Sequence, residues 1–214
     1  MNWSLIIIFQ AIILTSAISI DAFVASFAYG SNKIKIPFSS VQIINIVCSG
    51  VLGISLLIGT IARQYIPEGL TVFISFSVLL VLGLIKLLDG ITKSIIRKYS
   101  NLNKELNFSL FNFKFILRLY ADPEEADVDR SRTISGVEAV SLAIALSLDG
   151  LAVGFGAALA SVNVIVIILT SLIITPVFIL LGCYIGNKIA RKVSFNLSWI
   201  SGVILIVLAV LNLF

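Results

Sequence analysis

Ser19-Ile20-Asp21-Ala22 recurs later in the chain as Ser147-Leu148-Asp149-Gly150, and each copy lies inside a hydrophobic stretch that otherwise carries no charge. A phenylalanine follows each aspartate at the same spacing, Phe27 in the first copy and Phe155 in the second. A carboxylate near the centre of a bilayer costs about 2.5–3.5 kcal/mol on insertion scales. A chain that bears this cost twice, at equivalent positions of a repeat, is predicted to use both carboxylates at a cation or proton site.

The composition indicates an all-α integral membrane protein. Of the 214 residues, 59% are hydrophobic and 12% are charged, against about 25% charged in a soluble domain. A helix needs about 20 apolar residues to span the hydrocarbon core. The sequence predicts six such spans, at Leu5–Gly30, Val41–Ala62, Leu70–Ile91, Gly136–Ala160, Val162–Ile185 and Phe195–Phe214. The first is not predicted to be a cleaved signal peptide, because it lacks a basic start and contains Asp21.

The basic residues fall on one side of this predicted membrane protein. All of the 15 except Arg63 and Lys86 lie after the first, third or fifth span. Because positive residues stay on the cytoplasmic side, we expect both termini outside the cytoplasm of a bacterial cell whose plasma membrane holds the chain. The net charge of +4 therefore indicates a lipid bilayer as partner and not a nucleic acid.

The repeat extends beyond the aspartates and predicts the organisation of the chain. Ile74–Leu87 aligns with Ile200–Leu213, which pairs Ser75 with Ser201 and Leu79 with Leu205. We expect a first three-helix repeat at 1–94, a cytoplasmic connector at 95–135 and a second three-helix repeat at 136–214. Three is odd, so the second repeat would enter the membrane from the opposite face, as in inverted-repeat transporters. Duplication without transport is the alternative.

The oxygen donors near the aspartates favour a hard cation. Ser19 and Ser147 precede the aspartates, and Asn45 lies on the second span. The chain has no histidine, and its one methionine is Met1. Carboxylate and carbonyl ligands suit Mg²⁺, Ca²⁺ or Mn²⁺, whereas zinc and copper favour nitrogen or sulfur. A carboxylate pair can also exchange its metal for protons. A hydrogen-bonded aspartate pair with a structural role is the alternative.

Lys86 admits two interpretations. It lies near the end of the third span, with Asp89 one helical turn further on. Its long side chain could reach the lipid headgroups, which would explain the lysine without a function. Alternatively, Lys86 is an internal counter-charge for the two aspartates.

The segment before the fourth span resembles a calcium-binding loop. Asp127, Asp129, Ser131 and Glu138 occupy positions 1, 3, 5 and 12 of the twelve-residue pattern. Arg132 stands at position 6, where glycine normally makes a sharp turn at positive φ. Bound Ca²⁺ or Mn²⁺ in this loop is one prediction. The other is a simple capping box, Ser135-x-x-Glu138, that opens the next helix.

The repeated Ser-x-Asp motifs in three-helix halves resemble the MntP/YtaF family of small membrane proteins, which is grouped with LysE-type exporters. Two further stretches look most like the YtaF sporulation membrane proteins, Tyr29-Gly30 followed by Lys33–Pro37 and the run Ala121–Asp127. The resemblance covers the whole chain. It implies a LysE-like fold of six transmembrane helices and Mn²⁺ efflux, with Asp21 and Asp149 matching the family's intramembrane aspartates.

These observations predict a secondary transporter that exports a hard divalent cation, with Mn²⁺ as first candidate and protons as counter-ion. The alternative is a non-transporting sporulation membrane protein that acts through its cytoplasmic connector. No nucleophile–base arrangement is visible, so we expect neither an enzyme nor a cofactor. The sequence indicates no oligomeric state.

Overall fold

A computed structural model describes residues 3–88, 126–127, 129, 131–160, 162–189 and 198–211. These residues form the helices α1 Trp3–Ser31, α2 Phe38–Arg63, α3 Glu68–Leu87, α6 Gly136–Leu159, α7 Val164–Ile189 and α8 Ser198–Leu211. Of these described helices, all but α8 are long and apolar enough to cross a membrane. The prediction of an all-helical membrane protein is confirmed to that extent.

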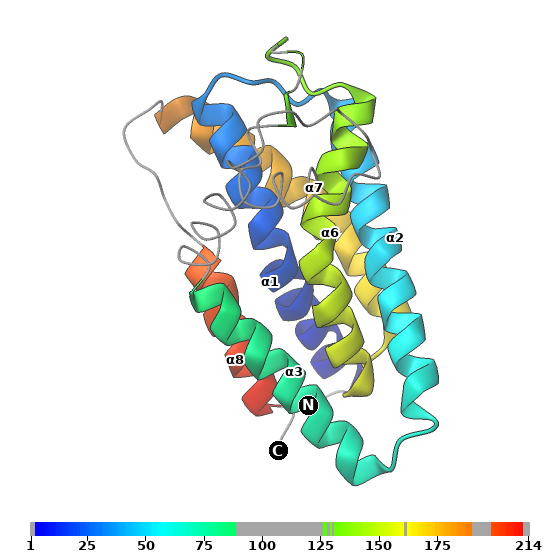
Figure 1. The fold of residues 1–214 in the computed structure, drawn as a ribbon. Coiled ribbons are helices and arrows are strands. Elements are labelled where there is room, and N and C mark those ends of the chain that lie inside the picture. The colour runs from blue at the N-terminus through cyan, green and yellow to red at the C-terminus, as the bar shows by residue number, and fades with distance from the viewer. Residues whose placement is uncertain are drawn as a thin grey trace, which may run out of the picture.

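The helices form one bundle in which each aspartate-bearing helix packs mainly against a helix from the other part of the chain (Figure 1). α1 packs along α7, α2 along α6, and α3 along α8. α3 also contacts α6, and α8 contacts α1. Figure 1 shows that α1 and α6 run in opposite directions, and that α1 begins at the end of the bundle where α8 finishes.

Glycines allow two of these helix pairs to approach closely. Gly182 and Gly186 of α7 lie against the backbone of α1 at Phe23 and Phe27. A Cβ atom at Gly154 of α6 would lie 2.9 Å from a methyl group of Leu52 on α2. In a membrane, helices associate through van der Waals packing at small residues because lipid is as apolar as the side chains. These contacts fix α1 and α6, and therefore their aspartates, within the bundle.

The turn between α1 and α2 is joined to the segment that precedes α6. The backbone N–H of Lys35 donates to the carbonyl of Arg132 at 2.8 Å, and that of Ile134 donates to the carbonyl of Lys35 at 3.0 Å. Ile134 is fully buried beneath this junction. α6 then begins at Ser135, whose side chain accepts from the N–H of Glu138 while the Glu138 carboxylate accepts from the N–H of Ser135. The predicted capping box is confirmed.

The described helices agree with the six predicted segments to within a few residues at most ends. Two further sequence interpretations concern residues outside the described ranges. One concerns Asp89, one helical turn after Lys86 in the sequence, and the other concerns most of the connector predicted at 95–135.

Candidate functional site

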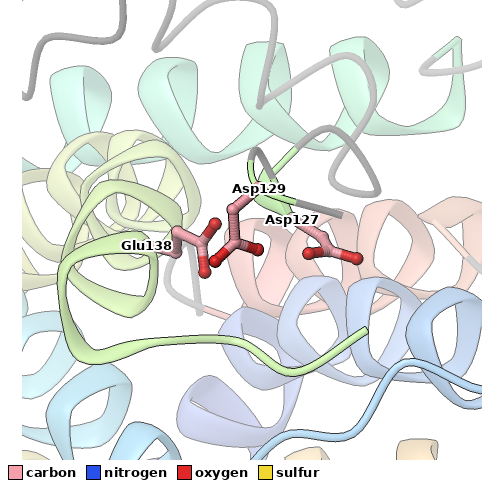
Figure 2. A group of neighbouring side chains, drawn as sticks. All are labelled: Asp127, Asp129 and Glu138. Carbon is pink, nitrogen blue, oxygen red and sulfur yellow. The ribbon is translucent and has the colours of Figure 1, made fainter. Parts of the chain in front are cut away.

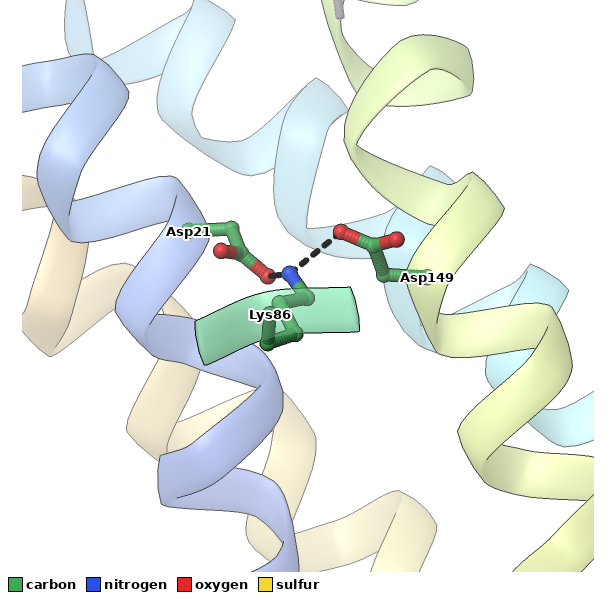
Figure 3. Close-up of polar contacts among 3 residues, drawn as sticks. All are labelled: Asp21, Lys86 and Asp149. Atoms are coloured by element: carbon green, nitrogen blue, oxygen red, sulfur yellow. Dashed lines mark hydrogen bonds and ion pairs between the residues drawn. The ribbon is translucent and has the colours of Figure 1, made fainter. Parts of the chain in front are cut away.

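The two intramembrane aspartates face each other across a lysine. Figure 3 shows Lys86 of α3 between Asp21 of α1 and Asp149 of α6, with its ammonium Nζ bonded to the Oδ2 atom of each carboxylate. Asp21 is 9% exposed and Lys86 is 5% exposed, whereas the side chain of Asp149 is 17% exposed. Two carboxylates in a low-dielectric environment repel each other unless a cation lies between them. Here the chain itself supplies that cation.

Of the two interpretations of Lys86, the structure supports the internal counter-charge. The headgroup interpretation is wrong, because a snorkelling lysine would extend its ammonium toward water. Lys86 lies in the last turn of α3, and yet its ammonium contacts interior turns of α1 and α6. The position of Lys86 near the end of the span therefore did not reveal that its side chain turns into the bundle.

A small cavity of about 20 Å³ lies between α1, α2, α6 and α7, and it is large enough for one water-sized particle. Ala22 and Gly150, the residues that follow the two aspartates, form part of its wall. Both predicted serines, Ser19 and Ser147, also line it. The remaining lining residues are Ile18, Cys48, Leu52, Leu146, Ser171 and Thr175.

Hydroxyl groups on α2 and α7 extend this polar centre. Ser19 of α1 shares a 3.1 Å hydrogen bond with Thr175 of α7, and Ser49 of α2 shares one of 2.8 Å with Ser171 of α7. Ser49, Ser171 and Thr175 were not among the site residues predicted from the sequence. The repeat in the sequence could have identified them. The offset that aligns Ser75 with Ser201 also aligns polar residues of the second and fifth spans: Asn45 with Ser171, and Ser49 with Thr175.

Asn45 lies at the edge of this centre and has a structural partner. Its Nδ2 donates to the carbonyl of Leu172 on α7 at 3.0 Å, and Ser49 donates to its Oδ1 at 3.4 Å. Leu172 lies four residues before Pro176, which is inside α7 and has no N–H to offer that carbonyl. Asn45 therefore supplies the missing donor. Its direct role as an ion ligand stays a prediction.

The three carboxylates of the predicted connector loop come together (Figure 2). One oxygen from each of Asp127, Asp129 and Glu138 lies within 4.8 Å of the others. Arg132, the non-glycine at position 6, adopts the left-handed φ of 61° that this position requires, and its N–H donates to Asp127 Oδ2 at 3.2 Å. The hydroxyl of Ser131 donates to the carbonyl of Thr133. Metal binding by this loop stays a prediction.

The pKa values of the two loop aspartates shift in opposite directions. Burial, the largest influence, raises the pKa of Asp127 above its usual value, although the N–H of Arg132 opposes this. The hydrogen bond from the N–H of Ser131 lowers the pKa of Asp129. The Oδ1 atom of Asp127 is buried and has no hydrogen-bond partner within the described part of the chain. Asp127 is therefore the first of the two to take up a proton as the pH falls.

Comparison with protein-family models identifies the group to which this architecture belongs. Residues 54–213 match the Mntp model, described as "Putative manganese efflux pump". The chain belongs to the Mntp family. The matched region includes Lys86 and Asp149 and covers most of the chain, and the description of the family is that of an efflux pump.

Two curated relatives align over nearly the full length. The chain is 29% identical to "Probable sporulation protein YtaF" of Bacillus subtilis over 94% of this chain and 97% of the relative. It is 28% identical to "Putative manganese efflux pump MntP" of Yersinia pestis over 91% of this chain and 89% of the relative. The resemblance to the MntP/YtaF family is thereby confirmed. No solved structure gives a significant match.

Proposed function

We propose that this member of the Mntp family is a secondary transporter that exports a hard divalent cation, with Mn²⁺ as first candidate. The observation that carries the proposal is the convergence of Asp21 and Asp149 inside the bundle. Two carboxylates match the charge of one divalent ion, and Ser19 and Ser147 offer neutral oxygen ligands. Membership of a family described as manganese efflux pumps supports the same ion.

The proposed architecture is a pair of inverted three-helix repeats. Exchanging α1 with α6, α2 with α7 and α3 with α8 interchanges the α1–α7 and α2–α6 contacts and the α3–α6 and α1–α8 contacts, and it leaves the α3–α8, α2–α7 and α1–α6 contacts as they are. The opposite directions of α1 and α6 (Figure 1) agree with inversion. In such transporters the substrate site lies at the interface of the repeats near the midplane. Asp21 and Asp149 occupy equivalent places on the two sides of that interface.

The proposed orientation has both termini outside the cytoplasm of the bacterial cell. The connector and the α1–α2 turn, which carry most of the basic residues, would then face the cytoplasm. Cations would be collected from that side. Protons are the proposed counter-ion, because carboxylates that release a metal can accept protons in its place.

Ion flux in proteoliposomes tests the proposal. The purified chain should move Mn²⁺ down an imposed gradient, with Mg²⁺, Ca²⁺, Zn²⁺ and Cd²⁺ compared in parallel. Cys48 places a soft sulfur in the cavity wall, so the comparison with Zn²⁺ and Cd²⁺ tests the assignment to hard ions. Flux equal to that of protein-free liposomes for every ion would contradict transport.

A second candidate is a sporulation protein that does not transport. The likeness to the relative named as a sporulation protein, together with the lysine that occupies the aspartate pair, favours it. In this case the connector would act on a partner. A deletion strain separates the candidates: manganese sensitivity supports the exporter, and a sporulation defect that an Asp21→Asn protein rescues supports the second candidate.

A further inference from the structure

We infer that Lys86 is a tethered surrogate cation that makes the Asp21–Asp149 site reject monovalent ions in favour of divalent ones. The inference rests on the proposed function, because it concerns how the same site chooses its ion. It assigns a role in specificity to a residue on α3, a helix that contributes neither carboxylate.

The geometry places the ammonium of Lys86 where a bound ion would bridge the carboxylates. Its Nζ atom bonds one oxygen of Asp21 and one of Asp149, and Figure 3 shows it between the two side chains. Lys86 is buried, so its charge is weakly screened by water or salt. Any cation that binds both carboxylates must first displace this ammonium.

The balance of charge decides which cations can do so. Asp21 and Asp149 carry two negative charges and Lys86 carries one positive charge, which leaves one net negative charge. A monovalent ion that replaced Lys86 would leave the carboxylate pair at the same net charge and would gain nothing electrostatically. A divalent ion would neutralise the pair, and attraction in a medium of low dielectric grows with the charge of the ion.

The tether adds a second disadvantage for a monovalent competitor. Lys86 is held beside the carboxylates by α3, which packs against α6 and α8. Because Lys86 is attached to the chain, its ammonium stays at the site without any cost of association. Free K⁺ must therefore compete with an equal charge that is already in place.

Cation-dependent thermal unfolding of the full chain in detergent tests the inference. A ligand that binds only the folded state raises the melting temperature. All proteins carry Asp127→Asn and Asp129→Asn, so that the loop carboxylates do not contribute. MnCl₂ is titrated in about 100 mM KCl or in choline chloride at equal ionic strength. With Lys86 present, Mn²⁺ should raise the melting temperature, and replacing choline by K⁺ should change neither this temperature nor the half-saturating Mn²⁺ concentration.

The Lys86→Met variant should lose this discrimination. K⁺ alone should now stabilise the protein relative to choline. In choline the half-saturating Mn²⁺ concentration should fall about tenfold or more, the order expected when a buried competing charge is removed, and K⁺ should raise it again. If K⁺ has no effect on a folded Lys86→Met protein, the inference is overturned.

A second variant serves if Lys86→Met does not fold because Asp21 and Asp149 repel each other without a cation between them. Lys86→Gln combined with Asp149→Asn keeps one net negative charge at the site, as in the natural chain, but has no tethered cation. K⁺ should stabilise this protein relative to choline, and insensitivity to K⁺ would overturn the inference. Failure of Mn²⁺ to stabilise the Lys86 protein is a different result: it contradicts the proposed cation site and the inference with it.

Discussion

Asn45 of α2 donates its side-chain amide to the carbonyl of Leu172 on α7, at the point where Pro176 leaves the helix without a donor. An unsatisfied carbonyl inside a membrane is costly because no water can reach it. The contact therefore explains how α7 carries a proline in its interior. It also joins α2 to α7.

Replacing Asn45 by alanine should cost about 1 kcal/mol of stability, the usual scale of a hydrogen bond between membrane helices. The half-saturating Mn²⁺ concentration for transport should stay nearly unchanged if Asn45 serves α7 and does not bind the ion. Adding Pro176→Ala restores an N–H near Leu172 and should recover part of the lost stability. Thermal unfolding and flux assays of the single and double variants measure both effects. A large rise in the half-saturating concentration would instead make Asn45 an ion ligand.

Neutralising either Asp21 or Asp149 to asparagine should abolish divalent cation flux while the protein stays folded. Asparagine keeps the volume of the side chain, and Lys86 keeps one ionised partner. The double variant removes both described carboxylates from the buried Lys86 ammonium, and breaking a buried ion pair typically costs about 3–5 kcal/mol. Adding Lys86→Met to the double variant should recover that stability without recovering flux. Flux at the natural rate in the triple variant would place the transport site elsewhere.

The close approach of α1 and α7 should make Gly186 intolerant of any side chain. A Cβ atom there would collide with the backbone of Phe27, so Gly186→Ala should destabilise the bundle by about 1–3 kcal/mol. Gly50 on α2 is the matched control, since a Cβ atom there meets nothing within 4 Å. Gly50→Ala should leave stability unchanged or raise it by up to about 1 kcal/mol. Equal melting temperatures for the two variants would contradict the packing argument.

The connector loop should bind Ca²⁺ or Mn²⁺ weakly, with a dissociation constant of about 10⁻⁴ M or higher. Because burial raises the pKa of Asp127, this binding should weaken on acidification sooner than ordinary aspartates would predict. Calorimetry of the full chain at about pH 7.5 and about pH 5 measures the change. Asp127→Asn should bind more weakly and lose most of the pH dependence. An unchanged binding signal in the Asp127→Asn/Asp129→Asn variant would mean that the loop is not a metal site and that Glu138 only caps the helix.

The proposed orientation predicts opposite labelling of two introduced cysteines. With Cys48 and Cys183 replaced by serine, a cysteine at Asn2 should react with an impermeant maleimide in intact cells. A cysteine at Asn103 should react only after the membrane is opened. The positive-inside rule is the physical basis. Labelling of Asn103 from outside would reverse the topology and remove the main support for cytoplasmic collection of the ion.

The helices were predictable from the sequence because long apolar runs between polar turns leave few alternatives in a membrane. The convergence of Asp21 and Asp149 was also predictable, because the repeat gives them equivalent positions. The capping box at Ser135 followed from local spacing alone.

The contact of Lys86 with both aspartates was not predictable in the same way. It depends on where α3 crosses α1 and α6, which is a tertiary relationship. The partner of Asn45 was hidden for a similar reason, since it is a carbonyl exposed by a proline on another helix. The left-handed turn at Arg132 shows that a loop fixed at both sides can hold a residue in a conformation that its side chain disfavours.

The ionic group at the centre of the bundle also bears on the order in which the chain can be built. Lys86 is synthesised 65 residues after Asp21, and Asp149 follows 63 residues later. The insertion machinery must therefore accept α1 before its counter-charge exists. Once α3 has entered, Asp21 and Lys86 can neutralise each other, and α6 then brings a carboxylate to a partner that is already in the membrane. The order of synthesis therefore makes the Asp21–Lys86 pair available before the carboxylate of Asp149 exists.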